Sequence, residues 1–286
     1  VIFKKSDDMA LIEKVLSRQS YFSRKSAGKD YEEQIVAANI DYLCIVSGLD
    51  GGRNFNPRGI ERYVAMATQG NTQPVIILNK VDLCTNRDEI IKSINSMLEN
   101  IPVFMVSATT KEGLDTFLSN FNAGSTIAFS GQSGVGKSSL INTLLGNEHL
   151  KTGTVRDGDL RGKHTTTHRE LFFLKNDIMV IDTPGMRELQ LWGDEDSLED
   201  AFIEIYDAAE GCRFKDCTHV NEPGCAVKQM VDDGSLDKGR YENYLQMRSE
   251  LQYLDSKVDT KGRLERKAKE KGLSKVIKNL KKIKKD

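Results

Sequence analysis

The order of two short motifs restricts the fold of this chain more than any other feature. Residues 131–138 have the sequence GQSGVGKS and match G-x-x-x-x-G-K-[ST], the pattern of a phosphate-binding loop. Residues 79–82 have the sequence NKVD, a pattern typical of guanine recognition, and they come first. In the common nucleotide-binding domains that carry both motifs, the phosphate loop precedes the guanine motif. Any fold assigned to this chain must account for the reversed order.

The hydrophobic pattern predicts an α/β sheet with helices on both faces. Apolar runs typical of buried strands lie at 40–48, 74–78, 102–107 and 125–131, and a hairpin is predicted at 170–182. Amphipathic segments typical of helices lie at 57–70, 87–100 and 113–121. Strand patterns end near residue 198, and helices are predicted at 198–210 and 240–254. The sequence thus predicts a sheet domain followed by a helical domain.

The phosphate-loop motif lies between a predicted strand and a predicted helix, which is the context that supports it. Its glycines allow backbone N–H groups to turn toward phosphate oxygens, and a helix N-terminus attracts negative charge. Lys137 is expected to reach the β- and γ-phosphates, and the Ser138 hydroxyl is expected to bind Mg²⁺. The predicted nucleotide-binding residues of the loop are Gly131, Ser133, Gly134, Val135, Gly136, Lys137, Ser138 and Ser139. The alternative is a glycine-rich turn without a ligand.

The guanine motif ends a predicted strand, at the edge where α/β sheets bind ligands. The Asp82 carboxylate can accept hydrogen bonds from the ring N–H and the exocyclic amine of guanine, whereas adenine presents the opposite donor pattern. Asn79 is expected to tie this motif to the phosphate loop, and Lys80 belongs to the same site. One strand later, a backbone N–H of Ser107 or Ala108 can contact the guanine O6. GTP and GDP, with Mg²⁺, are therefore the predicted ligands.

A third motif, DTPG at 182–185, closes another predicted strand. Asp182 is the expected acidic partner of Mg²⁺ through water, and the Gly185 N–H can sense the γ-phosphate. Upstream, residues 161–170 have the sequence RGKHTTTHRE. One of its three threonines is expected to complete the Mg²⁺ shell in the triphosphate state only. The alternative for these threonines is an exposed strand edge.

Three cysteines and a histidine near the C-terminus have metal-ligand spacing, Cys212-x4-Cys217-x-His219-x5-Cys225. Three thiolates and one imidazole make a closed tetrahedral shell for one structural Zn²⁺ per chain. The alternative is free thiols and a surface histidine. Cys44 lies in an apolar run and is expected in the core. An odd number of cysteines with one tight cluster favours a reducing compartment, so the predicted location is cytoplasmic.

Charge is distributed unevenly along the chain. The formal net charge is −1, yet residues 261–286 contain 12 lysines and arginines against 3 acidic residues, a net charge of +9. A basic segment on an acidic body favours a polyanionic partner, most simply nucleic acid. The alternative is a solvated tail. The sequence has no long apolar window, so no membrane helix is expected.

In this order, the motifs resemble the circularly permuted GTPases of the RsgA (YjeQ) type. The resemblance covers nearly the whole chain and rests on NKVDL, SAT, GQSGVGKSSL, GKHTTTHREL, DTPGMREL and GCRFKDCTHVNEPGCAV. It implies a Ras-like P-loop GTPase domain at 35–197. A remnant of an OB-type barrel at 1–34, with a linker from residue 22, would precede this domain. A zinc-binding, helical and basic domain at 198–286 would follow it.

The resemblance also accounts for the motif order. The helix predicted at 113–121 joins what would be the last strand of an ordinary GTPase domain to its usual first strand. The termini of compact domains often lie close together, so such a rejoining is tolerated. The residues after the DTPG motif then continue directly into the cysteine and histidine cluster.

The resemblance implies a Mg²⁺-dependent GTP hydrolase that assists late maturation of the small ribosomal subunit. It implies an rRNA-binding monomer, stimulated by the subunit, in which Thr166 is the magnesium-binding switch threonine. A second interpretation is an RNA-binding module gated by guanine nucleotide, with incidental turnover. An ATP-using P-loop enzyme conflicts with Asp82.

Residue 186 is a methionine, where Ras-type enzymes carry the glutamine that orients the attacking water. His164, beside the threonines, is the nearest candidate for this role. It can equally be a surface residue that contacts RNA. The predicted catalytic residues are therefore His164, Thr166 and Lys137.

Overall fold

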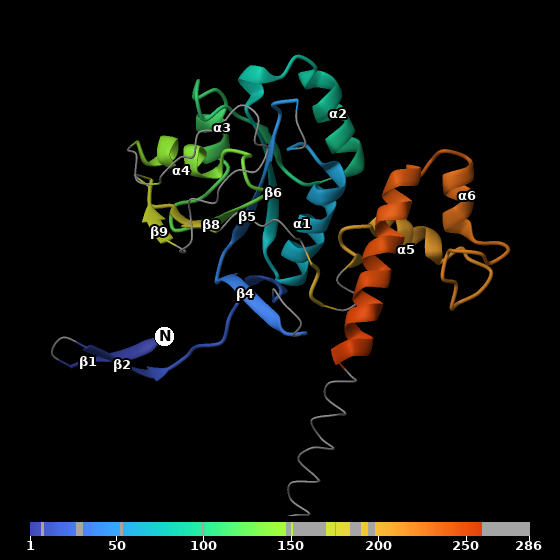
Figure 1. Ribbon diagram of the computed structural model, residues 1–286, viewed down its shortest axis with the longest axis horizontal. Helices are drawn as coiled ribbons and strands as arrows, with labels where there is room; N and C mark the ends of the chain where they lie inside the picture. The colour runs from blue at the N-terminus through green and yellow to red at the C-terminus, as the bar shows by residue number, and fades with distance from the viewer. Residues whose placement is uncertain are drawn as a thin grey trace, which may run out of the picture. The chain divides into compact units, whose positions relative to one another are not determined.

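A computed structural model of the protein describes residues 1–6, 9–26, 31–51, 54–98, 100–146, 150, 170–174, 176–183, 190–193 and 198–258. The chain falls into two compact units, residues 1–24 with 35–190 and residues 25–34 with 191–286. The first unit contains a large sheet, and the second contains the cysteine and histidine cluster (Figure 1). His164, Thr166, Gly185 and the basic segment 261–286 lie outside the described residues.

A six-stranded sheet forms the centre of the first unit, in the order β7-β6-β5-β8-β10-β9. Its strands are β5 (Tyr42–Gly48), β6 (Gln73–Asn79), β7 (Val103–Met105), β8 (Thr126–Ser130), β9 (Glu170–Phe173) and β10 (Met179–Asp182). Neighbouring strands are parallel except β9 and β10, which form the antiparallel hairpin. The predicted strands and the α/β class are confirmed.

The described helices of the first unit are α1 (Pro57–Gln69), α2 (Arg87–Met97), α3 (Leu114–Leu118) and α4 (Lys137–Leu145), with a 3-10 turn η1 (Val81–Leu83). The Asn56 side chain accepts from the Gly59 N–H at 3.1 Å and starts α1, whose first turn contains Pro57. α4 ends at Gly146, which has a φ of 75° that other residues rarely adopt. None of the helices within the described ranges is long and apolar enough to span a membrane.

Residues along β5 alternate between two buried faces of the sheet, as a strand requires. Cys44 is fully buried, as predicted, in a cluster that includes Phe117 of α3. Its neighbour Ile45 faces the other way and lines a pocket with Ile60 and Tyr63 of α1. Helices therefore cover both faces, and the central strands are apolar throughout because neither face meets water.

The short helix α3 connects β7 to β8 and is the joint that the permuted order requires. Phe117 is fully buried in it, with ring centroids of Phe104, Phe121 and Phe129 at 5.6, 5.0 and 6.1 Å. Phe104 belongs to β7 and Phe129 to β8. One side chain therefore ties both ends of the joint to the sheet through ring contacts.

The N-terminal residues form two separate two-stranded sheets. β1 (Ile2–Ser6) and β2 (Met9–Lys14) pair antiparallel, and apolar side chains such as Leu11 are exposed. β3 (Tyr21–Lys25) pairs with β4 (Glu33–Ala38). The linker predicted from residue 22 is therefore wrong at its start, because fully buried Phe22 contacts the Tyr63 ring and anchors β3. The remnant of an OB-type barrel stays a prediction.

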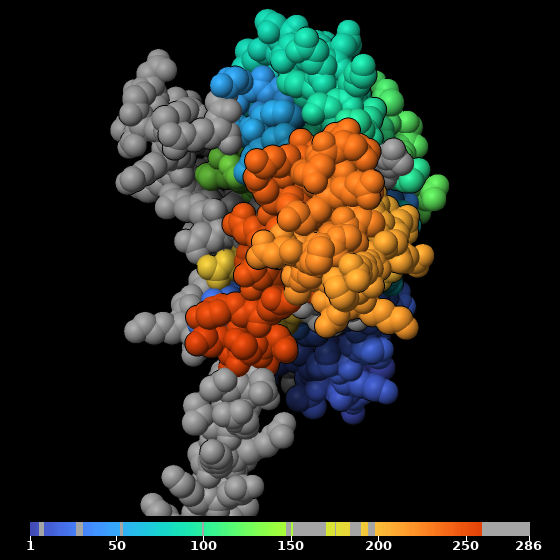
Figure 2. Space-filling model, turned by 90° about the vertical axis from the view of Figure 1, so that its right-hand side faces the viewer, coloured from blue at the N-terminus to red at the C-terminus, as the bar shows by residue number. Residues whose placement is uncertain are grey.

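The second unit is helical, as predicted. α5 (Ile203–Ala209) and α6 (Ala226–Asp232) are followed by a helix over residues 238–258. The buried Arg240 guanidinium pairs with Glu204 and donates to the Ala201 carbonyl at 2.7 Å. The rings of Phe202 and Tyr244 meet at 5.5 Å. These contacts hold the long helix against the start of α5, and Figure 2 shows the helical part of the unit in orange to red.

Phe117→Ala is expected to lower the free energy of unfolding by about 3–5 kcal/mol, because it leaves a cavity between α3 and the sheet. Phe173→Ala is the matched control, since Phe173 is 69% exposed on the edge strand β9. Phe173→Ala is expected to lower the free energy of unfolding by less than about 1 kcal/mol. Urea denaturation of both variants measures the difference, and equal losses would contradict the role of α3 as a packed joint.

Candidate nucleotide-binding site and metal centre

The predicted nucleotide-binding segments lie at one edge of the sheet. Asn79 ends β6, the phosphate loop follows β8, and Asp182 ends β10. The SAT segment, residues 107–109, follows β7. These four strands and β5 are mutually parallel, so their carboxyl ends share the edge where α/β sheets bind ligands. The fold therefore brings together motifs that are far apart in the sequence.

The Asn79 side chain joins three of these segments. Its amide nitrogen donates to the Val135 carbonyl of the phosphate loop at 2.9 Å, and its Oδ1 accepts from the Ala108 N–H at 3.2 Å. Asn79 is almost fully buried, so these two bonds fix its orientation. Thr143 of α4 adds another link, because its hydroxyl donates to the Ala108 carbonyl at 2.9 Å. The guanine motif is thus connected to both the phosphate loop and the SAT segment.

Close backbone contacts require the glycines of the phosphate loop. Gly131 and Gly136 have φ angles of 147° and 93°. A Cβ at Gly136 would lie 2.4 Å from Asn79 Nδ2, and a Cβ at Gly131 would lie 2.3 Å from the Val46 carbonyl oxygen. Both positions therefore exclude a side chain, and the neighbouring strands β5 and β6 determine the path of the loop.

Lys137, the first residue of α4, directs its ammonium group into the phosphate loop. Its Nζ donates to the carbonyl oxygens of Gly131 and Gln132, both at 2.8 Å. Burial lowers the pKa of Lys137 to about 8, and the charge of Asp182 offsets part of this effect. Phosphate oxygens can replace the two carbonyls as partners of the ammonium group. This replacement favours the protonated lysine and raises its pKa.

The guanine end of the site contains Asp82, Ser107 and Ala108. Asp82 is exposed in η1. The buried Ser107 hydroxyl accepts from the backbone N–H groups of Thr109 and Thr110 at 3.2 and 3.0 Å, which stabilises the turn of the SAT segment. The N–H of Ala108 donates to Asn79, and that of Ser107 donates to the Glu112 carbonyl at 3.0 Å. A contact from either group to guanine O6 must therefore share an N–H already engaged within the protein.

Ser138 and Asp182 are the described residues that are predicted to meet Mg²⁺. Asp182 is almost fully buried at the end of β10. Thr183 follows it and anchors this strand end by donating to the Phe129 carbonyl at 2.6 Å. Ser138 is partly buried in the first turn of α4. A hydroxyl and a carboxylate are oxygen ligands that suit Mg²⁺, so the donor set fits this ion.

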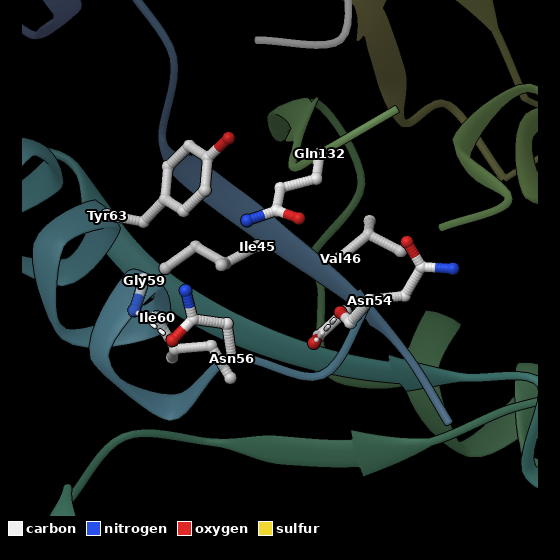
Figure 3. A pocket seen from close by; sticks show the side chains of 9 residues that line it. Ile45, Val46, Asn54, Asn56, Gly59, Ile60, Tyr63 and Gln132 are labelled. Atoms are coloured by element: carbon white, nitrogen blue, oxygen red, sulfur yellow. Dashed lines mark hydrogen bonds between the residues drawn. The ribbon is translucent and has the colours of Figure 1, made fainter. Parts of the chain in front are cut away.

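A small pocket lies beside the phosphate loop, between β5 and α1 (Figure 3). The Gln132 side chain extends from the loop toward Tyr63 and Ile45. Burial raises the pKa of Tyr63 well above its usual range, while Ser130 and the Gly131 backbone lower it to a smaller degree. The Tyr63 side chain is therefore buried next to the phosphate loop, in a pocket that it shares with Gln132.

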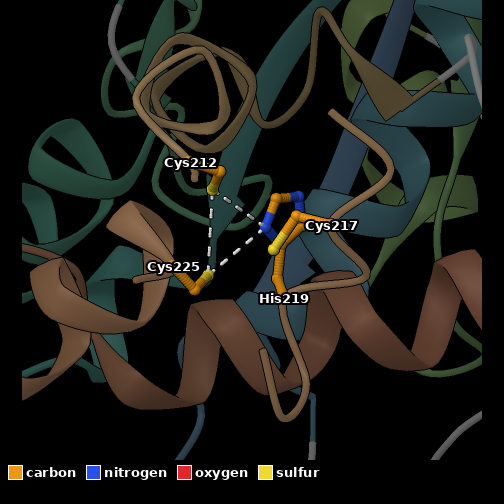
Figure 4. Close-up of side chains that lie close together, drawn as sticks. All are labelled: Cys212, Cys217, His219 and Cys225. Carbon is orange, nitrogen blue, oxygen red and sulfur yellow. Dashed lines mark hydrogen bonds between the residues drawn. The ribbon is translucent and has the colours of Figure 1, made fainter. Parts of the chain in front are cut away.

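In the second unit, Cys212, Cys217, His219 and Cys225 gather around one point (Figure 4). Their ligand atoms all lie within 4.8 Å of one another. The Cys212 and Cys225 sulfurs are 3.9 Å apart, and His219 Nδ1 lies 3.7 and 3.5 Å from them. A tetrahedral shell with Zn–S and Zn–N bonds of about 2.3 and 2.1 Å has edges of about 3.6–3.8 Å. The cluster therefore fits a structural Zn²⁺, with Nδ1 as the nitrogen ligand.

Groups around the cluster orient its ligands. The Lys228 N–H donates to the Cys225 sulfur at 3.4 Å, which orients this ligand. The Tyr241 hydroxyl donates to the His219 carbonyl at 2.6 Å. Burial and the charge of Arg248 lower the pKa of His219, so its imidazole is neutral and able to bind a metal. A bound Zn²⁺ contributes folding free energy to this segment.

The nucleotide motifs and the metal cluster have counterparts in known proteins. Residues 15–192 match the family model described as RsgA GTPase. The small ribosomal subunit biogenesis GTPase RsgA 1 of Oceanobacillus iheyensis is 42% identical over 272 residues, which are 95% of this chain and 77% of that protein. The RsgA of Methanosarcina acetivorans is 43% identical over 87% of this chain and 67% of its own length. The chain belongs to the RsgA GTPase family.

Solved structures support the same fold. YjeQ from Thermotoga maritima matches with a TM-score of 0.62 and 28% identity, over 85% of this chain and 78% of that chain. YloQ, a circularly permuted GTPase, matches with a TM-score of 0.62 and 24% identity, over 88% and 79%. The circularly permuted fold is therefore confirmed. As an RsgA GTPase, the protein is a hydrolase that acts on GTP.

A second family model, described as ABC transporter, matches residues 114–281. This range contains the phosphate loop, which many unrelated nucleotide-binding proteins share. It contains neither the guanine motif nor the SAT segment, which Asn79 joins to that loop. The combined site is therefore that of an RsgA GTPase.

Asp50 and Thr143 lie outside the residues predicted from the sequence, although both contact the nucleotide motifs. Asp50 forms an ion pair with Lys80, and Thr143 bonds to the SAT segment. The sequence did indicate Asp50, because this acidic residue follows the predicted strand 40–48 at the edge of the sheet that binds ligands. Thr143 gave no signal, because its place on a helix does not reveal that the Ala108 carbonyl lies within reach.

Affinity for GDP is expected to be constant below a pH of about 8 and to fall above it, because binding favours protonated Lys137. The loss can approach about tenfold per pH unit until the raised pKa of the bound state is reached. Fluorescence titration from about pH 7 to 9 measures the profile. Lys137→Ala is the control, since it removes the titrating group. If the GDP affinity of the wild type falls no more steeply with pH than that of Lys137→Ala, GDP binding is not linked to protonation of Lys137.

One zinc ion per chain is expected, bound by Cys212, Cys217, His219 and Cys225. Cys217→Ser should lose the zinc and unfold the second unit while the first unit still binds GDP, because the two units have separate cores. Cys84→Ser is the control, since Cys84 lies outside the cluster. Elemental analysis and limited proteolysis report the outcome. Equal zinc content in the two variants would show that the cluster is not the metal site.

Proposed function

We propose that this GTPase is a nucleotide-controlled switch that acts late in the maturation of the small ribosomal subunit. Its relatives from O. iheyensis and M. acetivorans are small ribosomal subunit biogenesis GTPases by name. The observation that carries the proposal is the pair of hydrogen bonds of the Asn79 side chain, one donated to Val135 and one accepted from Ala108, which unite the guanine motif, the phosphate loop and the SAT segment. GTP is the substrate, and GDP and phosphate are the products.

In the proposed site, Asp82 recognises the guanine base, while Lys137 and the N–H groups of the phosphate loop bind the phosphates. Ser138 and Thr166 would hold Mg²⁺ with GTP, and the ion would supply positive charge that offsets that of the phosphates. Hydrolysis removes the γ-phosphate and with it the interaction that orders the loop around Thr166. Residues after the DTPG motif continue into the second unit, which gives this change a covalent route to the zinc centre.

The proposed partner is the rRNA of the subunit, bound by the second unit. The rings of Tyr31 and Tyr253 meet edge to face at 6.3 Å, and the ammonium groups of Lys25 and Lys257 lie 4.6 and 5.1 Å from their centroids. Tyr253 is 55% exposed. Exposed rings can stack on unpaired bases, and ammonium groups can bind phosphates. The 12 lysines and arginines of 261–286 add positive charge for the same partner.

Intrinsic hydrolysis is expected to be slow, because Met186 has no group that can orient a water molecule. We assign this role to His164, and Thr166, two residues later in the sequence, would bind the Mg²⁺ ion. A partner that orders residues 161–167 would hold both side chains against the γ-phosphate. Pre-positioning of this kind can lower the barrier by about 2–4 kcal/mol.

We also propose that the protein is a cytoplasmic monomer. Three thiol ligands of a metal site remain available where thiols stay reduced. The described nucleotide-binding segments lie in one unit and the metal ligands in the other, and all of them belong to a single chain. One copy thus supplies the described residues of both sites. Light scattering with and without GTP tests the monomer.

Purified small ribosomal subunits are expected to raise the single-turnover rate of GTP hydrolysis roughly 30–900-fold, because they order the switch loop. The increase should fall with added salt, because phosphate contacts release counterions. His164→Ala should lose most of the increase in rate. A variant without residues 261–286 should need a higher concentration of subunits to reach the same rate. Large subunits are the matched control.

The outcomes separate the competing interpretations. No acceleration by small subunits rejects the partner. Full stimulation of His164→Ala rejects the role of that histidine and leaves the partner standing. Nucleotide-dependent binding to small subunits without any change in turnover favours the alternative, an RNA-binding module gated by guanine nucleotide. Cosedimentation with GDP, with a non-hydrolysable GTP analogue and without nucleotide makes this last comparison.

A further inference from the structure

An acidic residue outside the sequence motifs contacts the nucleotide site. Asp50 lies two residues beyond β5, and its Oδ2 is 2.5 Å from the Nζ of Lys80 in the guanine motif. The two side chains are 21% and 23% exposed, so water screens this ion pair less than a surface pair. The loop after β5 is thereby attached to Lys80, which lies between Asn79 and Asp82 in the guanine motif.

The same ammonium group also contacts the phosphate loop. Lys80 Nζ donates to the Gly134 carbonyl at 2.8 Å. Its Cε lies 3.9 Å from where a Cβ at Gly136 would be, so the aliphatic chain runs along the loop. An ammonium group has three donors, and Asp50 and Gly134 engage two of them from different segments. The position of Lys80 therefore depends on both acceptors.

Asp50 is itself held in place by the end of β5. The Asn54 amide nitrogen donates to both carboxylate oxygens of Asp50, at 2.9 and 3.2 Å. The Asn54 carbonyl accepts from the Ser47 hydroxyl at 2.8 Å and from the Gly48 N–H at 3.2 Å. Burial raises the pKa of Asp50, but the hydrogen bonds from Lys80 and Asn54 outweigh it, so the net pKa is lowered. The carboxylate is thus both oriented and ionised.

A carboxylate so placed has a specific effect on the lysine side chain. A free lysine samples many rotamers, and ordering it on nucleotide binding costs conformational entropy. Asp50 already orders Lys80 across the phosphate loop before nucleotide binds. The side chain therefore loses its conformational entropy when the protein folds and not when the nucleotide binds. The ion pair lies where the guanine motif meets the phosphate loop. We therefore expect it to affect how tightly the nucleotide is bound more than the rate at which the phosphate is cleaved.

We propose that Asp50 is a positioning residue that slows nucleotide release by holding Lys80 against the phosphate loop. The proposal rests on the assignment of Asn79, Lys80 and Asp82 to the guanine site. It concerns GDP and GTP alike, because Lys80 belongs to the guanine motif, and both nucleotides carry the same base. It predicts an effect on KM and on the release rate, with little effect on kcat.

The test is the dissociation rate of a fluorescent GDP analogue, chased with excess GDP in stopped flow. Asp50→Asn keeps the shape of the side chain and an acceptor, and it removes the charge. It is expected to release the analogue about 5–20-fold faster, which corresponds to about 1–1.8 kcal/mol. Asp50→Glu should recover part of the wild-type rate. Asp207→Asn is the control, since it removes an exposed carboxylate from α5 in the other unit.

A double-mutant cycle separates positioning from general destabilisation. If Asp50 acts through Lys80, Asp50→Asn should add little to the faster release caused by Lys80→Met. Independent, multiplying effects of the two substitutions overturn the proposal, as does wild-type release from Asp50→Asn. A drop in thermal stability that accounts for the faster release, with no rescue by Asp50→Glu, overturns it too. Failure of Lys80→Met itself to change release points instead to a wrong guanine site.

Discussion

The buried amide of Asn79 is the interaction on which the nucleotide site depends. The guanine motif ends β6 and the phosphate loop follows β8, and the central strand β5 lies between these two strands. The side chain of Asn79 reaches past the end of β5 and connects them through the Val135 carbonyl, and it is the buried one of the two guanine-motif side chains that bond to the loop. This contact depends on neighbouring strand ends and not on which motif is synthesised first. A permuted chain therefore keeps the same site.

The parts of the site that the sequence predicted are those in which chemistry requires particular residues at fixed spacing. Gly131 and Gly136 were predictable because close backbone contacts exclude any side chain there. The zinc ligands were predictable because a tetrahedral shell needs four donors, and a short loop supplies them. The strands of the sheet were predictable because burial on both faces produces continuous apolar runs.

What the sequence could not provide depends on contacts between distant segments. The pairing of Asp50 with Lys80 joins two loops whose proximity follows only from the order of β5 and β6 in the sheet. Phe22 lay inside a predicted linker, because its burial comes from Tyr63 on α1 and not from a local pattern. In the second unit, α5 and α6 have seven residues each, too few to be stable alone, so packing and the metal decide their existence.

The place of α3 has a consequence for synthesis of the protein. Because this helix joins β7 to β8, the central strand β5 is made early and pairs at once only with β6, on one side. Its other edge waits for β8, where Tyr42 pairs with Ile127. At about 5–20 residues per second, a nascent chain would expose this apolar edge for several seconds. This order of synthesis thus leaves an apolar strand edge open while the growing chain can aggregate, and the nucleotide site is complete only when both of its halves have emerged.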